Sequence, residues 1–229
     1  MYTVKFYKGD YYKRQQDANA DNAAAYVEHH FNSSSSDQAN YATVVVGSNA
    51  SQTSRNWGCW YAKAIADLFG TRVGGEQGIL VGGWNGRGDG NLKHTNMPAV
   101  LLEPLFASNP QQAEIIRSES GQTTLARVLV ESIRRFIPKG GLIAFSVGHK
   151  YKTSSPNDRG AALTGGGWEA DYAEKVLEKA ATLLTLEIST PAPRTLRVMQ
   201  GERLLFETPV DEDAVVVWSS DRNLLFIPD

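Results

Sequence analysis

The sequence predicts an α/β fold: a mostly parallel central sheet flanked by helices, with a small antiparallel β appendage at the C-terminal end. Segments with strand character alternate with segments whose apolar residues recur at helical spacing, which is typical of α/β domains. Several expected strands are continuous apolar runs, the pattern of strands that are buried on both faces. After Pro191-Ala192-Pro193 the pattern changes to short β segments separated by turns.

The first half of the chain is expected to hold three strands and two helices. The expected strands cover residues 4–7, 24–31 and 41–46. A polar helix is expected over residues 10–21. A second helix runs from Arg55 to a cap at Gly70, with apolar side chains at helical spacing: Trp57, Tyr61, Ile65 and Leu68. This spacing favours core packing for Trp57 and Tyr61.

The second half continues the alternation. The expected elements are a strand over 98–102, a long helix through Leu125 and Phe136, a strand over 142–147 and a helix over 168–184. Residues 74–90 are glycine-rich and irregular, and Pro138-Lys139-Gly140-Gly141 combines a helix stop with a turn. The expected tail strands cover 196–199, 203–206, 214–218 and 224–227. We therefore expect a main domain over residues 1–189 and an appendage over residues 190–229.

The composition excludes several classes of function. The chain has 229 residues, 41% of them hydrophobic, and a net charge of −2, so it lacks the basic character of nucleic-acid-binding proteins. No apolar run approaches the length of a membrane-spanning helix, and residues 1–12 do not resemble a signal peptide. Cys59 is the single cysteine, which excludes an intrachain disulfide and thiolate zinc clusters.

Four side chains with metal-ligating groups lie at the ends of the expected core elements. His30 and Glu103 each end a strand, His149 follows the strand over 142–147, and Glu169 opens the last helix. Ligands of α/β sheets bind at the carboxyl ends of the strands, and a hydrolytic zinc site takes three His, Glu or Asp ligands and one open position. Each residue alone also has an ordinary explanation; Glu169, for example, suits a helix N-terminus.

The segment 142–184 resembles the opening of the amidase type 3 family, the zinc-dependent N-acetylmuramoyl-L-alanine amidases. In that family a strand ends in Gly-His, a loop follows, and a glutamate begins the first helix. Gly148-His149 and Glu169 match this pattern. The resemblance implies that His149 and Glu169 are the first two zinc ligands.

The segment that begins at Met1 resembles the rest of the same family. Arg14, Asn19 and His30 fit its pattern of an arginine, an asparagine five positions later and the second zinc histidine eleven positions further on. Asn32 completes the family's His-x-Asn, and this register selects His30 rather than His29.

The strand that carries the family's catalytic glutamate also has a counterpart in the first half. Residues 97–103, with the sequence MPAVLLE, are followed by Phe106-Ala107-Ser108-Asn109. The family has a strand, a catalytic glutamate and a Phe-x-Ser-Asn segment in this order. The resemblance therefore implies that Glu103 is the catalytic residue, and it covers about residues 1–188.

The two halves stand in the opposite order from the family. A circular permutation explains this, because the old ends would be joined through residues 138–141, an ordinary length for a helix-to-strand loop. The new termini would lie between the helix that ends near Leu184 and the strand over 4–7. A domain-swapped pair of chains could build the same site, so the oligomeric state stays open.

The resemblance implies hydrolysis of the amide bond between N-acetylmuramic acid and L-alanine in peptidoglycan, the expected partner. His149, Glu169 and His30 are expected to hold Zn²⁺, which polarises the scissile carbonyl and lowers the pKa of water toward about 7. Glu103 is expected to move the water's proton to the departing alanine nitrogen. Asn32 and Arg14 are candidates for substrate binding or for supporting the ligands.

Two other functions stay open on the sequence. The chain could be a non-catalytic peptidoglycan-binding domain, or a zinc carboxypeptidase acting on wall peptides, although no arginine for a free carboxylate can be placed. The substrate lies at the cell wall, outside the cytoplasm, and no export signal is visible. A phage lysin, a mature fragment or a cloned domain fits this combination.

Overall fold

The computed structural model describes residues 1–186 and, in the tail, residues 194–200, 203–210, 215–218 and 224–227. Contacts between residues divide the chain into two compact units, Met1–Leu186 and Glu187–Asp229. The boundary that the change of sequence pattern predicts, between residues 189 and 190, lies outside the described residues.

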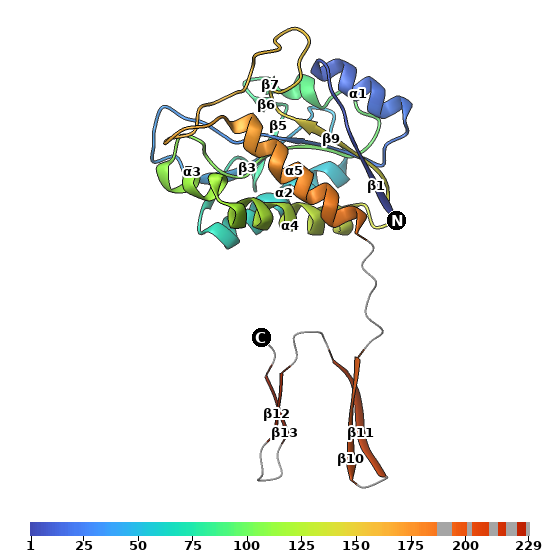
Figure 1. Ribbon diagram of the computed structural model, residues 1–229. Coiled ribbons are helices and arrows are strands. Elements are labelled where there is room, and N and C mark those ends of the chain that lie inside the picture. The colour runs from blue at the N-terminus through green and yellow to red at the C-terminus, as the bar shows by residue number, and fades with distance from the viewer. Residues whose placement is uncertain (187–193, 201–202, 211–214, 219–223, 228–229) are drawn as a thin grey trace. The chain divides into compact units, whose positions relative to one another are not determined.

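A seven-stranded sheet runs through the first unit (Figure 1). Its strands are β1 (Tyr2–Phe6), β2 (Ala25–His29), β3 (Tyr41–Val46), β4 (Arg72–Val73), β5 (Ile79–Val81), β8 (Ala99–Glu103) and β9 (Gly141–Val147). The order along the sheet is β1-β9-β2-β8-β3-β4, and β5 also pairs with β3. The pairs β1-β9, β9-β2 and β2-β8 are parallel, and β3 runs antiparallel to β8. The predicted mostly parallel sheet is confirmed.

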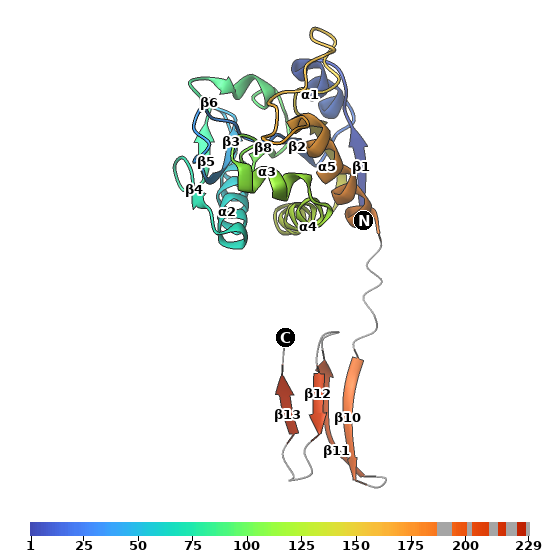
Figure 2. The same ribbon diagram turned by 60° about the vertical axis from the view of Figure 1, so that its left-hand side comes forward.

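Helices cover both faces of this sheet (Figure 2). Three long helices lie on one face: α2 (Gln52–Phe69), α4 (Glu119–Phe136) and α5 (Glu169–Thr185). Helix α1 (Tyr11–Ala20) lies on the other face and contacts the 3-10 helix η1 (Asp89–Asn91). The short helix α3 (Pro110–Arg117) leads directly into α4.

Two apolar cores form because successive side chains of a strand point to opposite faces of the sheet. Strand β2 contributes Val27 to the larger core and Tyr26 to the smaller one. The larger core includes Trp57 and Tyr61 of α2, which are both fully buried. The core packing of these two aromatic residues, predicted from their helical spacing, is confirmed.

Side chains and a glycine fix the ends of the long helices. The Ser51 hydroxyl accepts a hydrogen bond from the Ser54 amide at the start of α2, at 3.2 Å, and Ser118 does the same for Gly121 in α4, at 2.9 Å. Such caps satisfy amides that have no partner within the helix. Gly70 ends α2 with a φ of 63°, and its amide bonds the carbonyl of Ala66, as the sequence predicts.

The sequence did not predict α3 or the strands within the glycine-rich stretch. Strands β6 (Gly83–Trp84) and β7 (Arg87–Gly88) form a short antiparallel hairpin there. A Cβ at Gly83, whose φ is +77°, would lie 1.8 Å from the carbonyl oxygen of Arg87. The hairpin therefore depends on glycine at position 83, and short strands occur within a stretch that the sequence predicts to be irregular.

In the second unit, the described residues form two antiparallel strand pairs. Strand β10 (Arg194–Gln200) pairs with β11 (Arg203–Val210), and β12 (Val215–Trp218) pairs with β13 (Leu224–Ile227). The predicted antiparallel β character of the tail is confirmed for these strands.

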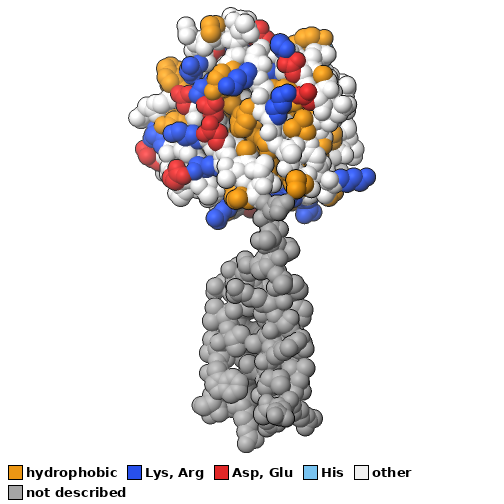
Figure 3. Space-filling model, turned by 45° about the vertical axis from the view of Figure 1, so that its right-hand side comes forward, with side chains coloured by type: hydrophobic (Ala, Val, Ile, Leu, Met, Phe, Trp, Pro, Cys, Tyr) orange, Lys and Arg blue, Asp and Glu red, His pale blue; other side chains and the backbone are white. Residues whose placement is uncertain are grey.

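The surface of the first unit mixes both signs of charge. Figure 3 shows Lys and Arg side chains interspersed with Asp and Glu on the visible face, in keeping with the net charge of −2. Among the described residues, no helix is both long enough and apolar enough to cross a membrane.

Candidate active site

The candidate site lies where three neighbouring strands end. His30 directly follows β2, Glu103 is the last residue of β8, and Gly148-His149 directly follows β9. These three strands are adjacent and parallel, so their carboxyl ends meet at one edge of the sheet. Glu169, the first residue of α5, reaches the same place.

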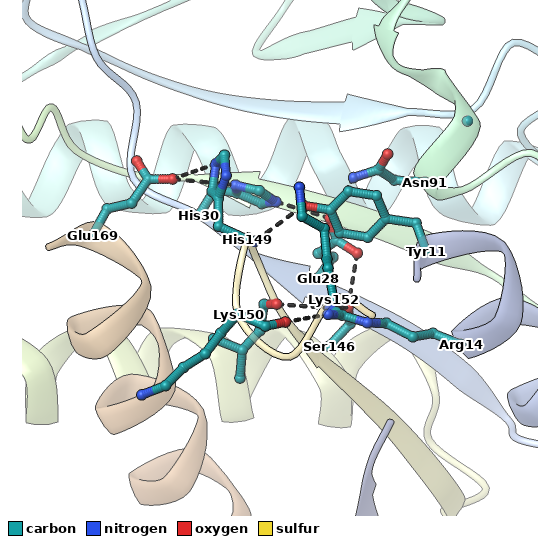
Figure 4. Close-up of polar contacts among 12 residues, drawn as sticks. Tyr11, Arg14, Glu28, His30, Asn91, Ser146, His149, Lys150, Lys152 and Glu169 are labelled. Carbon is teal, nitrogen blue, oxygen red and sulfur yellow. Dashed lines mark hydrogen bonds and ion pairs between the residues drawn. The ribbon is translucent and has the colours of Figure 1, made fainter. Parts of the chain in front are cut away.

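His30, His149 and Glu169 form a compact group (Figure 4). His149 Nε2 lies 2.7 Å from Oε1 of Glu169, and His30 Nδ1 lies 3.5 Å from the same oxygen. The two imidazole rings meet edge to face, with their centroids 4.9 Å apart. One ligand atom from each residue lies within 4.8 Å of the others, so the group can hold a metal ion.

Two glycines make this close approach possible. A Cβ at Gly148 would lie 2.4 Å from the imidazole of His30, and a Cβ at Gly160 would lie 2.3 Å from the Glu169 carboxylate. Gly160 also has a φ of +70°, which favours glycine. The glycine of Gly148-His149 therefore has a packing reason: it leaves room for the second histidine.

The backbone at His149 is held in an uncommon conformation. Its φ is 63°, a value that is rare for residues other than glycine. The His149 amide donates a hydrogen bond to the hydroxyl of Tyr11 at 3.0 Å. Arg14 is fully buried and donates to the carbonyls of Val147, at 2.7 Å, and of Lys150. Helix α1 thus braces the loop that carries His149.

Each histidine also contacts a carboxylate on the side away from the group. His149 Nδ1 lies 3.0 Å from Asp158, and His30 Nε2 lies 2.8 Å from Glu28. Metal-binding histidines typically donate their second ring N–H to such a partner. The resemblance to the amidase family identified neither carboxylate. A charged residue inside the apolar strand over 24–31 was the available signal for Glu28.

Ion pairing sets the protonation of these groups. Burial opposes protonation of His30, but hydrogen bonds with Glu169 and Glu28 outweigh it and raise its pKa to about 10. Burial opposes ionisation of Glu169, but its hydrogen bonds with His149 and His30 lower its pKa. A metal ion that binds here therefore competes with a proton on His30, because a ligating imidazole must be neutral.

Glu103 differs from the other carboxylates of the site. Burial raises its pKa, the nearby charge of His30 opposes this, and the charge of Glu169 adds to it. Glu103 thus lies close enough to the histidine–glutamate group to feel its charges, and it has a greater tendency to carry a proton than an exposed glutamate. A proton-transfer residue needs this property near neutral pH.

Three other residues that the sequence singled out have contacts of their own. Asn32 forms a bridge with Phe106, and its side chain accepts a hydrogen bond from the amide of Ser33. Asn19 ties α1 to the segment that follows η1, through the carbonyl of His94. His29 is buried beside Phe31, with ring centroids 5.0 Å apart.

The donor set suits zinc. Two imidazole nitrogens and one carboxylate oxygen are ligand types that catalytic zinc sites use, and three protein ligands leave a fourth position open. The partners at the far ring nitrogens, Glu28 and Asp158, already orient both imidazoles toward the group.

A comparison with known protein families identifies the family of this chain. A family model described as N-acetylmuramoyl-L-alanine amidase matches residues 3–135, more than half of the chain. The chain belongs to this amidase family. The matched range includes His30 and Glu103, whereas His149 and Glu169 lie beyond it.

Solved structures of amidases from three bacteria are similar to this chain. The catalytic domain of CwlV from Bacillus (Paenibacillus) polymyxa var. colistinus is 26% identical to this chain, with a TM-score of 0.47. The matched region covers 56% of this chain and 66% of the CwlV domain. The N-acetylmuramoyl-L-alanine amidase of Clostridium difficile 630 has 22% identity, the same coverages and a TM-score of 0.48. Ami1 from Mycobacterium smegmatis has 19% identity, coverages of 56% and 60%, and a TM-score of 0.43.

The chain thus spans slightly less than two thirds of the first two of these structures. A comparison with curated proteins found no match.

Proposed function

We propose that the chain is a zinc-dependent amidase that hydrolyses the amide bond between N-acetylmuramic acid and L-alanine in peptidoglycan. The observation that carries this proposal is the meeting of His30, His149 and Glu169 at one edge of the sheet, with ligand atoms within 4.8 Å of one another. Membership of the amidase family supports the choice of substrate.

Three residues would hold the zinc ion: His30 through Nδ1, His149 through Nε2, and Glu169 through its carboxylate. When bound there, zinc supplies Lewis acidity, which favours attack of water on the scissile carbonyl. Glu28 and Asp158 hold the two imidazoles at their far nitrogens, so the ligands are oriented before the ion arrives. Such preorganisation strengthens metal binding.

Glu103 would move the proton. It accepts a proton from the attacking water and delivers it to the departing alanine nitrogen, which is a poor leaving group until it is protonated. Its raised pKa suits both halves of this transfer. Arg14 supports the loop that carries His149, because its guanidinium donates hydrogen bonds to the carbonyls of Val147 and Lys150.

The order of the two halves is part of the proposal: the chain is a circular permutant of the family's usual arrangement. Helix α5 contacts β1, and the end of α5 and the start of β1 lie at the same side of the unit, next to the N-terminus (Figure 1). The amide of Gly141, at the proposed new junction, donates to the carbonyl of Met1 at 3.1 Å. A connection from α5 to β1 therefore suits the fold, and permutation is tolerated where termini lie close.

The proposed substrate places the chain's action at the cell wall. The first unit carries every residue of the proposed site. Residues 190–229 form the proposed appendage.

The test of this function is a product assay on purified peptidoglycan. Cleavage at the proposed bond releases intact stem peptides with a new N-terminal L-alanine and leaves the glycan strands whole, which amine labelling and mass spectrometry detect. Glu103→Gln should lower the turnover rate by about 10²- to 10⁴-fold and should retain zinc. Glu131→Gln, an exposed residue of α4, is the matched control and should leave the rate unchanged.

Other outcomes of this assay would favour a different function. Cleavage within the stem peptide would favour a zinc carboxypeptidase. Binding to peptidoglycan with no release of peptide by the zinc-loaded chain would favour a wall-binding domain and would overturn the proposed activity.

A further inference from the structure

Glu28 is a fully buried carboxylate beside the proposed metal site. It lies on β2, where all five residues are buried. A buried ion costs several kcal/mol unless it is paired and hydrogen-bonded, so a carboxylate at this position needs a specific set of partners.

The partners of Glu28 come from three separate segments (Figure 4). One oxygen accepts from His30 Nε2 at 2.8 Å and from the Asn91 side-chain amide at 2.5 Å. The other oxygen accepts from the hydroxyl of Ser146 at 2.8 Å, and Tyr26 lies 3.3 Å from it. Both oxygens are thus hydrogen-bonded, which fixes the plane of the carboxylate.

A buried arginine extends this hydrogen-bond network through Ser146. Arg14 donates to the hydroxyl of Ser146 at 2.8 Å, and Ser146 in turn donates to Glu28. The Glu28 carboxylate is thus held 2.8 Å from one nitrogen of His30 by a hydrogen-bonded chain that runs through Ser146 to Arg14.

This contact determines which nitrogen of His30 faces the metal site. A neutral imidazole has one N–H donor and one nitrogen that can ligate or accept. The carboxylate of Glu28 holds the N–H on Nε2, which leaves the lone pair on Nδ1. That atom is the one that faces Glu169, at 3.5 Å.

We propose that Glu28 is a positioning residue for metal binding: it accepts the Nε2 hydrogen of His30 and thereby presents Nδ1 to the ion. The proposal rests on the metal site of the proposed function but not on the identity of the substrate. Asp158 contacts His149 in a similar way but is partly exposed and is shared with Lys152. Glu28, in contrast, has no exposed surface.

The test measures zinc affinity of the full chain by competition with a chromophoric chelator. Replacing a carboxylate behind a metal-binding histidine lowers metal affinity by about 10- to 100-fold, and we expect losses in this range for Glu28→Gln and Glu28→Ala. Glu28→Gln keeps an acceptor for His30 and should lose less than Glu28→Ala. Glu131→Gln is the control and should bind zinc as tightly as the wild type.

Nitrogen-15 NMR of the histidines separates positioning from general support of the fold. In the zinc-loaded wild type, His30 should carry its hydrogen on Nε2 and its metal on Nδ1. Metal on Nε2, or unchanged affinity in both folded variants, would overturn the proposal. Should Glu28→Ala fail to fold, the wild-type spectrum and Glu28→Gln still decide. A wild type that binds no zinc would instead overturn the proposed function itself.

Discussion

The imidazole rings of His30 and His149 lie edge to face, 4.9 Å apart between centroids, although they come from opposite halves of the chain. β2 and β9 are neighbouring parallel strands, and each histidine follows the end of its strand. Gly148 provides the space that the ring of His30 occupies. The proposed metal site therefore exists only when both halves are folded together.

The raised pKa of Glu103 has a measurable consequence for stability. Its folded-state pKa lies above the value of about 4.3 in an unfolded chain, mainly because of burial. The free-energy cost of ionising it in the folded state is absent below the unfolded pKa and complete above the folded pKa. Glu103→Gln removes this cost, so it should raise the melting temperature at pH 7 to 8 and have little effect at pH 4.

Thermal melts across this pH range, with a chelator present, measure the effect. Equal melting temperatures for Glu103→Gln and wild type at pH 7 to 8 would show that the carboxylate is not destabilised by its surroundings.

Trp57 should be among the residues on which the fold most depends. It is fully buried, and its indole N–H donates to the hydroxyl of Ser132 at 2.9 Å, so it joins α2 to α4. Replacement of Trp57 by Ala should cost about 3–5 kcal/mol of unfolding free energy. Trp84, 64% exposed, is the matched control, and its replacement should change stability by about 0.5 kcal/mol or less. Denaturant unfolding measures both, and similar losses would contradict this packing.

Restoring the family's order of segments tests the proposed permutation. A chain that begins at Gly141, joins Thr185 to Tyr2 through a short linker and ends at Lys139 should fold and bind about one zinc ion. The reason is that α5 already contacts β1. Circular dichroism and elemental analysis check the outcome. A rearranged chain that is unfolded with several linker lengths would argue against a permuted relationship.

The sequence predicted the fold well where its pattern was unambiguous. The β-branched run Tyr41–Val46 forms β3 with the expected bounds. In contrast, α3 begins at Pro110 on a segment of eight residues, and β6 and β7 lie among glycines. These short elements are held by their surroundings, so their own sequence predicts them poorly.

The sequence likewise identified some residues of the candidate site and not others. His30, His149, Glu169 and Glu103 were identified by family pattern, and the structure brings the first three into one group. Glu28 and Asp158 were not identified, because a carboxylate's role depends on what faces it. For Glu28 those partners include Asn91 and Ser146, whose proximity only the fold establishes.

The most direct test of the central claim is the zinc content of the wild-type chain and of His30→Ala and His149→Ala, measured by elemental analysis after removal of loosely bound metal. We expect about one zinc ion per wild-type chain and its loss in both variants, because each half of the chain supplies one histidine to a single site. No zinc in the wild type, or zinc retained in both variants, would contradict it.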